Sequence, residues 1–505
     1  MIKTNSSVGP LPQDLPDPSP QPPPDRAPPV PSDVLSVPEH GLEPGAAEPR
    51  RVIIIGAGLA GLAAGYELDR QGHDVVILEA QNRVGGRVHT LRSFAAGLYA
   101  EAGAMRIPRA HDLTIRYCEE FDLPLRPFVM GNPKGLVFVG GTRRTMEEAN
   151  ADPTPLGFDL AEHERGRTAD EMWAEAIGEL RAQVQADGDS AWEAIVREYD
   201  RYSLHEFLRH RGWSTGAIEY FGVMNFLESD MHNAFVEVLR EDLGRAYVDM
   251  VEIAGGMDGL PNAFYRHLRR QIRLGADVFA IDQDPGSVTL HYKTEAGRFS
   301  VTGDYAICTV PFSVLRHVEV LAPFSREKQR AIRQLNYHAS TKILFQVRER
   351  IWEDEGIRGG ATVTDLPIRR MNYPTPDPEV GRGILLASYT WGQDALQWGA
   401  MDPETRQEEA LDDVERIHPG IREVYEVGDS YAWYADRWAR GAFAMFAPQQ
   451  QTELHADIVK PEGRILFAGE HCSLYHAWIQ GALESGIRAA RQIHETSHLA
   501  PLAPA

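Results

Sequence analysis

The first strong hydrophobic pattern in the chain begins at residue 52. Residues 52–55 are all apolar and β-branched, which is typical of a short strand buried on both faces. Residues 62–68 have the pattern of a helix, and residues 74–78 form a second strand-like run that ends at Glu79. The pattern therefore predicts a strand, a turn, a helix and a second strand with an acidic residue at its end.

The predicted turn, residues 56–61, has the glycine spacing of a dinucleotide-binding loop. Gly56 allows a tight turn, Gly58 lets the backbone approach a pyrophosphate, and Gly61 lets the helix pack on the strand. The phosphates would lie at the helix N-terminus, where free N–H groups favour negative charge. Glu79 can accept hydrogen bonds from both ribose hydroxyls and would repel a 2′-phosphate, which disfavours NADP. Which other dinucleotide binds stays open at this point.

Further motifs narrow the choice. In residues 83–87 two glycines are flanked by arginines, which can bring backbone and guanidinium groups to the same pyrophosphate. Residues 463–471 predict a strand that ends in Gly469 and Glu470, and residues 478–486 predict the start of a helix. In this order the motifs resemble the flavin-containing amine oxidase family. Nearly all of residues 51–495 share the resemblance, and five stretches match the L-amino-acid oxidase branch: 101–108, 255–261, 341–343, 370–374 and 476–478.

The resemblance implies FAD as the cofactor. In the family the acid at Glu470 bonds the ribityl chain, and the following helix directs its N-terminus at the flavin. Some relatives attach FAD to a cysteine, but the corresponding residues 440–443 contain no thiol, so we expect noncovalent FAD. The predicted cofactor-binding residues are Gly56, Gly58, Ala60, Gly61, Glu79, Ala80, Arg87, Gly103, Ala104, Met105, Arg106, Val278, Gly469, Glu470, Trp478 and Ile479.

An amino-acid substrate needs a partner for its carboxylate. A guanidinium can bind both carboxylate oxygens, and Arg106 occupies the family position that faces the flavin. The alternative is a structural arginine that caps a helix or pairs with Glu101. The resemblance also places the hydroxyl of Tyr373 on the carboxylate, although Tyr373 could instead be a core aromatic residue before a proline turn.

The remaining catalytic candidates are Lys342, Trp438 and Trp478. Lys342 lies in the otherwise apolar run 339–345, so its amine must be paired or must reach a cavity. In the family this lysine holds a water against the flavin and assists the reaction with O2; the alternative is a buried ion pair. The resemblance makes Trp438 and Trp478 the aromatic walls around the substrate and makes the Ala477 carbonyl an acceptor for its amine. Both tryptophans could equally be core residues.

These residues imply oxidative deamination of L-amino acids. A hydride passes from Cα to flavin N5, the imino acid hydrolyses to a 2-oxo acid and ammonia, and O2 reoxidises the flavin with release of hydrogen peroxide. We expect His471 and His476 to be structural histidines. The alternatives are an amine oxidase, an amino-acid 2-monooxygenase of the same fold, and a non-catalytic flavin-binding interaction protein. The preferred side chain cannot be read from the sequence; a broad, or aromatic and apolar, preference is the expectation.

The motif spacing predicts an α/β protein with a discontinuous Rossmann-like FAD-binding domain (51–86, 253–335 and 463–497). A mixed-sheet substrate-binding domain is expected from residues 87–150, 245–252 and 336–462. Residues 151–244 are rich in amphipathic helical patterns and predict a helical domain that flanks the substrate entrance. Residues 1–50 hold 14 of the 34 prolines and predict an extended, disordered tail.

Composition adds mainly exclusions. The net charge is −22, which argues against a nucleic-acid partner or an anionic membrane surface, and no apolar run is long enough to span a bilayer. Three scattered cysteines are too few for a disulfide framework or a thiolate zinc site, so no metal is expected. With no secretory signal in view, we expect a cytoplasmic enzyme. Its partners would be an L-amino acid and O2, and by family resemblance it would be a homodimer.

Overall fold

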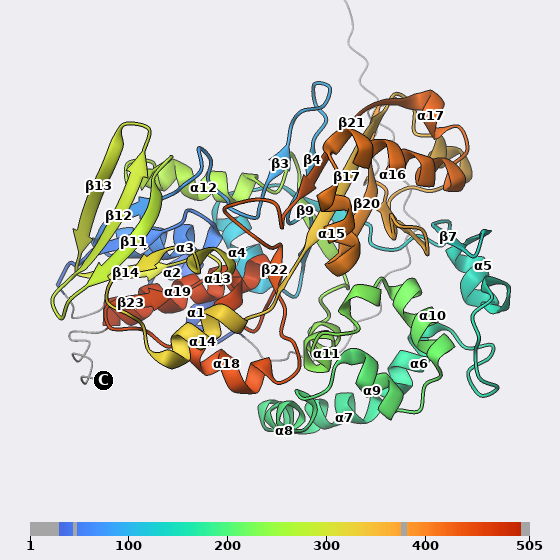
Figure 1. Cartoon of the computed structure of the whole chain (residues 1–505), viewed down its shortest axis with the longest axis horizontal. Coiled ribbons are helices and arrows are strands. Elements are labelled where there is room, and N and C mark those ends of the chain that lie inside the picture. The colour runs from blue at the N-terminus through green and yellow to red at the C-terminus, as the bar shows by residue number, and fades with distance from the viewer. Residues whose placement is uncertain (1–29, 44–47, 375–380, 496–505) are drawn as a thin grey trace, which may run out of the picture.

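The computed structural model describes residues 30–43, 48–374 and 381–495. Residues 1–29 and 44–47 of the predicted tail, 375–380 of the substrate-binding segments and 496–497 of the FAD-binding segments lie outside the described residues. In Figure 1, a four-stranded sheet lies at one end of the molecule, a larger sheet at the other, and a group of helices below the larger sheet.

A five-stranded parallel sheet gathers three distant parts of the chain. Its strand order is β10-β2-β1-β14-β23. Ile53 of the central strand pairs with Val76 on one side and Ala306 on the other, and all three are buried, as the apolar runs predict. The strands are β1 (Arg51–Ile55), β2 (Asp74–Leu78), β10 (Ile272–Arg273), β14 (Tyr305–Cys308) and β23 (Ile465–Phe467).

Helices from both ends of the chain cover this sheet. Helix α3 (Leu59–Arg70) contacts α12 (Gly259–Leu268) and the C-terminal helix α19 (Ile479–Glu495). Helix α4 (Asp112–Glu120), which the sequence assigns to the substrate-binding domain, packs on α19 and shares the core of the FAD-binding segments. The domain boundary therefore does not follow the predicted residue 87 at this point.

The predicted tail is partly folded. Residues 32–40 form α1 (Ser32–Leu35) and α2 (Val37–His40), with α1 against α19 and α2 against α4. Val34 and Val37 are each 2% exposed. The expectation of a disordered segment is therefore wrong for these residues, because a few well-spaced apolar side chains suffice to dock a short segment on an existing core.

An antiparallel sheet has the strand order β13-β12-β11-β15, and β15 is added parallel to β11. Together with the five-stranded sheet it forms the part of the molecule that we call the nucleotide half, after its predicted dinucleotide-binding loop. Its strands are β11 (Asp277–Gln283), β12 (Val288–Thr294), β13 (Gly297–Gly303) and β15 (Glu319–Val320). The neighbouring helices are α13 (Phe312–Leu315), α14 (Arg326–Gln334) and α18 (Gln450–Val459), and α14 contacts both others.

The larger sheet is mixed, with order β21-β17-β20-β19-β18-β7-β8, and β18 runs parallel to β7. Helices α15 (Gly392–Ala400) and α16 (Pro403–Ile417) cover it, followed by α17 (Ile421–Val424). Its strands are β7 (Leu136–Val139), β8 (Thr142–Thr145), β17 (Ser340–Val347), β18 (Ala361–Thr364), β19 (Arg370–Asn372), β20 (Gly383–Trp391) and β21 (Tyr425–Ala432). A smaller sheet joins β5 (Ile107–Pro108), β9 (Met250–Ile253) and β6 (Leu125–Phe128); two-stranded pairs are β3 (Thr90–Leu91) with β4 (Ala100–Glu101) and β16 (Tyr337–His338) with β22 (Phe443–Ala444).

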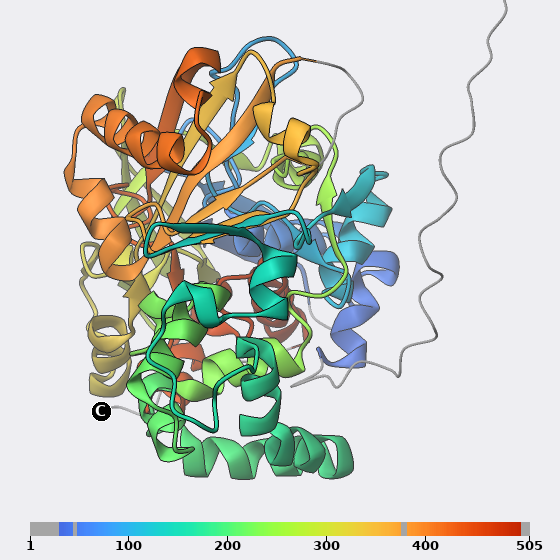
Figure 2. The same ribbon diagram turned by 90° about the vertical axis from the view of Figure 1, so that its right-hand side faces the viewer.

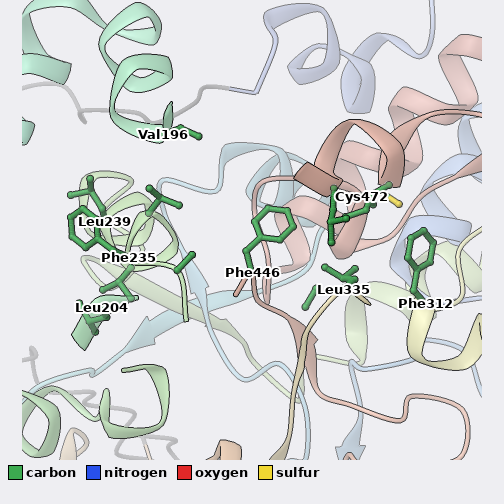
Figure 3. Packing of buried hydrophobic residues seen from close by; sticks show 14 of the residues in the cluster. Val196, Leu204, Phe235, Leu239, Phe312, Leu335, Phe446 and Cys472 are labelled. Carbon is green, nitrogen blue, oxygen red and sulfur yellow. The ribbon is translucent and has the colours of Figure 1, made fainter. Parts of the chain in front are cut away.

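Residues 151–244 are helical, and in Figure 2 they form a group of their own below the strands of the larger sheet. One hydrophobic cluster connects these helices to the nucleotide half. Figure 3 shows Phe446 between Leu239 on the helical side and Leu335 on the other. The helices are α5 (Met146–Ala151) at the boundary, then α6 (Ala169–Ala176), α7 (Gly178–Asp187), α8 (Asp189–Tyr199), α9 (Leu204–His210), α10 (Thr215–Asn225) and α11 (Phe235–Leu243).

We expect Phe446→Ala to destabilise the protein by about 3–5 kcal/mol, because it opens a cavity where the helical group meets the nucleotide half. The midpoint of thermal unfolding should fall by several degrees. The matched control is Val427→Ala, whose side chain is exposed and should leave the midpoint almost unchanged. Equal midpoints for Phe446→Ala and the wild type would mean that this contact does not join the two parts.

Candidate active site

A cavity of about 380 Å³ extends from the glycine loop after β1 to the larger sheet and α11. Every predicted cofactor-binding residue lines it except Gly61. Gly61 instead lies against the turn, where an added Cβ would approach the Gly56 carbonyl oxygen to 2.1 Å. Its role is therefore the close packing of helix and turn, and not a direct contact with a ligand.

The glycine loop leaves room for a ligand. Gly56 has φ +101°, a conformation that favours glycine. Gly58 is the N-cap of α3 and lines the cavity, and a Cβ placed there would meet no protein atom within 4 Å. The helix N-terminus and the open space before Gly58 fit a phosphate group.

Glu79 ends β2 at the same loop. Its carboxylate accepts hydrogen bonds from the backbone N–H groups of Ala57 (2.7 Å) and Gln81 (2.8 Å). Burial raises the pKa of Glu79, while these hydrogen bonds oppose the rise. The carboxylate is therefore fixed beside the loop, with lone pairs left for a ribose.

Glu470 ties together several segments of the cavity wall. It accepts a hydrogen bond from Arg87 Nη1 (2.7 Å) and from the backbone N–H groups of Ala444 and Ala477 (both 3.1 Å). Burial alone would raise the pKa of Glu470, but the charge of Arg87 and the hydrogen bond from the Ala477 backbone N–H help to lower it overall. Ala477, held by this carboxylate, has the left-handed φ of +66° and lines the cavity just before Trp478.

Arg106 lies at the other end of the cavity and forms no ion pair among the residues described. Its side chain is buried, and its Nε and Nη1 make no hydrogen bond among the residues described. Glu101, the alternative partner, instead accepts hydrogen bonds from the Thr90 hydroxyl (2.9 Å) and the Met257 backbone N–H (2.8 Å). The structure therefore excludes the predicted alternative of an Arg106–Glu101 pair. A buried cation without a partner is costly, which indicates that this group awaits an anion.

Lys342 is bound to carbonyl groups and not to a carboxylate. Its Nζ donates to the carbonyl oxygens of Gly103 (2.7 Å) and Glu101 (3.1 Å) and lies 4.7 Å from the ring centroid of Tyr389. Burial, with a smaller contribution from the charge of Arg106, lowers the pKa of Lys342 to about 7. The alternative of a buried ion pair is therefore wrong, and the amine lines the cavity.

Tyr373 does not reach the cavity. Its hydroxyl shares hydrogen bonds with Thr362 Oγ1 and His418 Nε2 (both 2.7 Å), and its ring packs in the core beside Trp352. The prediction that Tyr373 holds the substrate carboxylate is wrong.

Tyr389, on strand β20, does line the cavity, and it pairs in register with Lys342 of β17. Burial raises its pKa, so the hydroxyl stays protonated and can donate. In the sequence Tyr389 belongs to a run that predicts only a sheet strand, which is why the sequence analysis missed it.

The two predicted tryptophans lie apart. The guanidinium of Arg437 stands 4.1 Å above the ring of Trp438 and is 3.6 Å from Asp277, next to Val278. Trp438 therefore lines the nucleotide end, contrary to its predicted place beside the substrate. Trp478 lies at the end of the cavity that contains Arg106, which we call the substrate end. Its indole N–H donates there to Glu241 (2.9 Å).

Other residues at the substrate end have no motif that could reveal them. Glu241 comes from α11, and Tyr247 from the loop that follows it; the Tyr247 hydroxyl donates to Glu241 (2.7 Å). Trp433 donates its indole N–H to the Ala102 carbonyl (2.8 Å), beside the backbone that holds Lys342. The aromatic and apolar side chains that complete this wall are Tyr389, Trp391, Phe443 and Met445.

Both His471 and His476 are buried, but neither ring nitrogen of His471 has a hydrogen-bond partner in the described structure, so His471 is not a hydrogen-bonded structural histidine. His471 is fully buried against Phe312, and burial lowers its pKa to about 3. His476 Nδ1 lies 3.1 Å from a Glu237 carboxylate oxygen. In the described part of the chain, no group of His, Cys, Asp and Glu side chains could hold a metal ion, and no helix is long and apolar enough to cross a membrane.

A glycine loop at a parallel sheet and one cavity that continues from it to an unpaired guanidinium define a dinucleotide-dependent enzyme. The sequence profile of flavin containing amine oxidoreductases matches residues 59–494. "Putative L-amino-acid oxidase YobN" of Bacillus subtilis is 38% identical over 470 residues, 92% of this chain and 98% of that protein. The L-amino acid oxidase of Cerastes cerastes is 34% identical over 472 residues, 92% of this chain and 90% of the relative.

Among solved structures, putrescine oxidase bound to putrescine has a TM-score of 0.73 at 20% identity and covers 88% of this chain and 99% of its own. Cyclohexylamine oxidase from Brevibacterium oxydans has a TM-score of 0.72 at 20% identity, and the match covers 89% of this chain and 99% of that oxidase. These two likenesses concern the fold. The chain belongs to the family of flavin containing amine oxidoreductases, and it is a flavin-dependent oxidase of amino acids or amines.

The lowered pKa of Lys342 predicts a pH-dependent gain from Lys342→Met. Between about pH 7 and pH 10.5 the unfolded wild type holds a proton that the folded state has lost, so its stability rises by about 1.4 kcal/mol per pH unit. The variant should therefore gain most over the wild type below pH 7, and the gain should shrink towards pH 10.

Thermal midpoints of the flavin-free proteins from pH 6 to pH 9 test this expectation. Lys134→Met, at an exposed position, is the control and should show no such trend. If the stability gained by Lys342→Met stayed constant with pH, the lowered pKa of the buried Lys342 amine would be contradicted.

Proposed function

We propose that this protein is an FAD-dependent L-amino-acid oxidase. It converts an L-amino acid to the 2-oxo acid and ammonia and reduces O2 to hydrogen peroxide. The single observation that carries the proposal is the buried guanidinium of Arg106, which lines the substrate end of the cavity without a carboxylate partner among the residues that the structure describes. An amine without a carboxylate would leave that charge unpaired, whereas an amino acid supplies the missing anion.

The relatives support the same choice. Those at 34–38% identity over 92% of the chain are named L-amino-acid oxidases. The neighbours named for simple amines share the fold at about one fifth identity. The substrate class therefore rests on Arg106 together with these names.

The residues present fit FAD. The loop at Gly56 and Gly58 would hold the pyrophosphate, Glu79 the adenosine ribose, and Glu470 with Arg87 the flavin end. When bound, the flavin supplies the redox chemistry, accepting a hydride from Cα and passing the electrons to O2. Attachment is proposed to be noncovalent, because the cavity wall at residues 440–443 has no thiol and none of the three cysteines lines the cavity.

The chain's own groups bind and orient the amino acid. Arg106 takes the carboxylate in a bidentate pair, and the protonated hydroxyl of Tyr389 donates to the same group. The Ala477 carbonyl and the ring of Trp478 border the amine and Cα, and Lys342 holds a water beside the reacting carbon. Because the side chain of Arg106 is buried, its charge acts on the carboxylate with little screening.

Gly58→Val should prevent flavin loading while the fold persists. Its side chain would project into the open space before the N-terminus of α3, where the phosphates would lie. The purified variant should be colourless, with a far-ultraviolet circular dichroism spectrum like that of the wild type. Gly131→Val, at an exposed position away from the cavity where a Cβ would also meet open space, is the control and should retain the flavin absorbance. A yellow Gly58→Val protein would refute this placement of the cofactor.

Arg106→Ala should raise KM for L-amino acids about 100-fold or more, since two charge-assisted hydrogen bonds are lost, while flavin content stays normal. Arg106→Lys should be intermediate, because a lysine keeps the charge but not the paired geometry. Tyr373→Phe is the matched control and should leave KM unchanged, whereas Tyr389→Phe should raise it. Normal kinetics in Arg106→Ala would refute the carboxylate assignment.

A peroxide-coupled screen of the twenty L-amino acids and their D-forms tests the proposal as a whole. Phenethylamine serves as the amine that lacks a carboxylate. We expect peroxide and 2-oxo acid with L-amino acids and negligible turnover of phenethylamine. Preferential oxidation of phenethylamine would identify an amine oxidase. An amide product would identify a monooxygenase. A flavin that is not reduced by any amino acid would identify a non-catalytic binding protein.

A further inference from the structure

Glu241 is a second charged group at the substrate end of the cavity. It lies near the C-terminal end of α11, and its carboxylate oxygens accept hydrogen bonds from the Tyr247 hydroxyl and the Trp478 indole N–H. Among the residues described, no lysine, arginine or histidine forms an ion pair with it. Its carboxylate lines the large cavity on one side and a small chamber on the other.

Tyr247 contacts both Arg106 and Glu241, neither of which forms an ion pair among the residues described. The guanidinium carbon of Arg106 is 5.8 Å from the centre of the Tyr247 ring, and the hydroxyl of the same ring is 2.7 Å from Glu241. Arg106 and Glu241 thus line one cavity without forming an ion pair with each other in the described structure. A cation and an anion held apart in this way are complementary to a zwitterion.

Building on the proposed function, we propose that Glu241 binds the α-ammonium group of the incoming amino acid and accepts one of its protons. One N–H bond of the ammonium breaks, its electron pair stays on nitrogen, and an O–H bond forms on Glu241. The product is the neutral amine, with the carboxylate still bound to Arg106. No electrons are exchanged in this step.

The need for such a group follows from the chemistry of the substrate. The α-amino group of a peptide has a pKa of about 7.7–8.0, and the free carboxylate of an amino acid raises it further. Less than about a tenth of the substrate is therefore neutral at pH 7. A cationic nitrogen opposes loss of a hydride from the adjacent carbon, so a proton acceptor in the cavity makes the abundant zwitterion usable.

The surroundings of Glu241 suit it to this task. Burial raises its pKa, and the neighbouring charge of Glu237 adds to the rise, while the hydrogen bonds from Tyr247 and Trp478 and the charge of Arg106 oppose it. A carboxylate of raised pKa is a better proton acceptor than an exposed one. The titratable and charged groups that face it from the surrounding elements are Arg106, His111, Asp230, Glu237, Arg240, Tyr247, Tyr389 and His476.

The chamber behind Glu241 offers the proton a way out. It has a volume of about 20 Å³, enough for one water, and it is bounded by His111, Glu237, Arg240 and His476. Arg240 Nε and His476 Nε2 are buried and have no hydrogen-bond partner in the described structure. A water bound there would connect Glu241 to the His476–Glu237 pair, whose N···O distance is 3.1 Å.

The pH dependence of flavin reduction in Glu241→Gln tests the proposal. The variant keeps the size of the side chain and hydrogen-bonding groups for Tyr247 and Trp478, but it cannot take a proton. At pH 7, anaerobic reduction by L-phenylalanine should be at least about tenfold slower than in the wild type. The difference should disappear towards pH 10, where the substrate arrives as the neutral amine. Glu241→Asp should restore a profile close to that of the wild type.

Binding of unreactive ligands gives a second readout that needs no turnover. α-Methyl-L-phenylalanine is a zwitterion without a Cα hydrogen, and 3-phenylpropionate has the carboxylate but no amine. Each ligand is titrated into the flavin-loaded proteins at pH 7. Compared with the wild type, Glu241→Gln should bind the zwitterion at least about fivefold more weakly and should bind 3-phenylpropionate with unchanged affinity.

Distinct results would overturn the proposal. Equal pH profiles for Glu241→Gln and the wild type, or equal loss of both ligands, would show that Glu241 is only structural. A defect confined to L-arginine and L-lysine would show that it contacts the substrate side chain instead. Failure of the proposed function would give a different result, because no L-amino acid would then reduce the flavin of the wild-type protein.

Discussion

A guanidinium group enclosed in a cavity without a carboxylate is the constraint on which this site depends. Removing a charge from water costs several kcal/mol unless another charge or a set of hydrogen bonds compensates it. Arg106 has no such compensation at its Nε and Nη1. In the proposed function the carboxylate of an amino acid would remove this cost, and binding energy would become available where the reaction occurs.

The surrounding architecture keeps that charge unpaired. Glu101, the nearest acid along the chain, is occupied by Thr90 and the Met257 backbone, and Lys342 is held by carbonyl groups. Arg87 is already paired with Glu470. Segments more than 380 residues apart thus cooperate in one wall, and the parallel sheet that joins β1 to β23 brings them together.

The sequence predicts those parts of the molecule whose physics is local. The βαβ unit, its glycine turn and Glu79 follow from hydrophobic pattern and spacing, and the cavity contains every predicted cofactor residue but Gly61. Side chains that depend on strand pairing could not be placed in this way. Tyr373 directly follows β19, and Tyr389 lies on the adjacent strand β20; the register that sets Lys342 opposite Tyr389 places Tyr389, and not Tyr373, at the cavity. Glu241 reaches the cavity through packing of α11, for which one acid on an amphipathic helix gives no signal.

The most direct measurement is a crystal structure of the flavin-loaded protein soaked anaerobically with an L-amino acid. We expect the substrate carboxylate within about 3 Å of Nε and a terminal nitrogen of Arg106, in a paired geometry. A carboxylate bound elsewhere, with the Arg106 guanidinium turned away from it, would contradict the central claim.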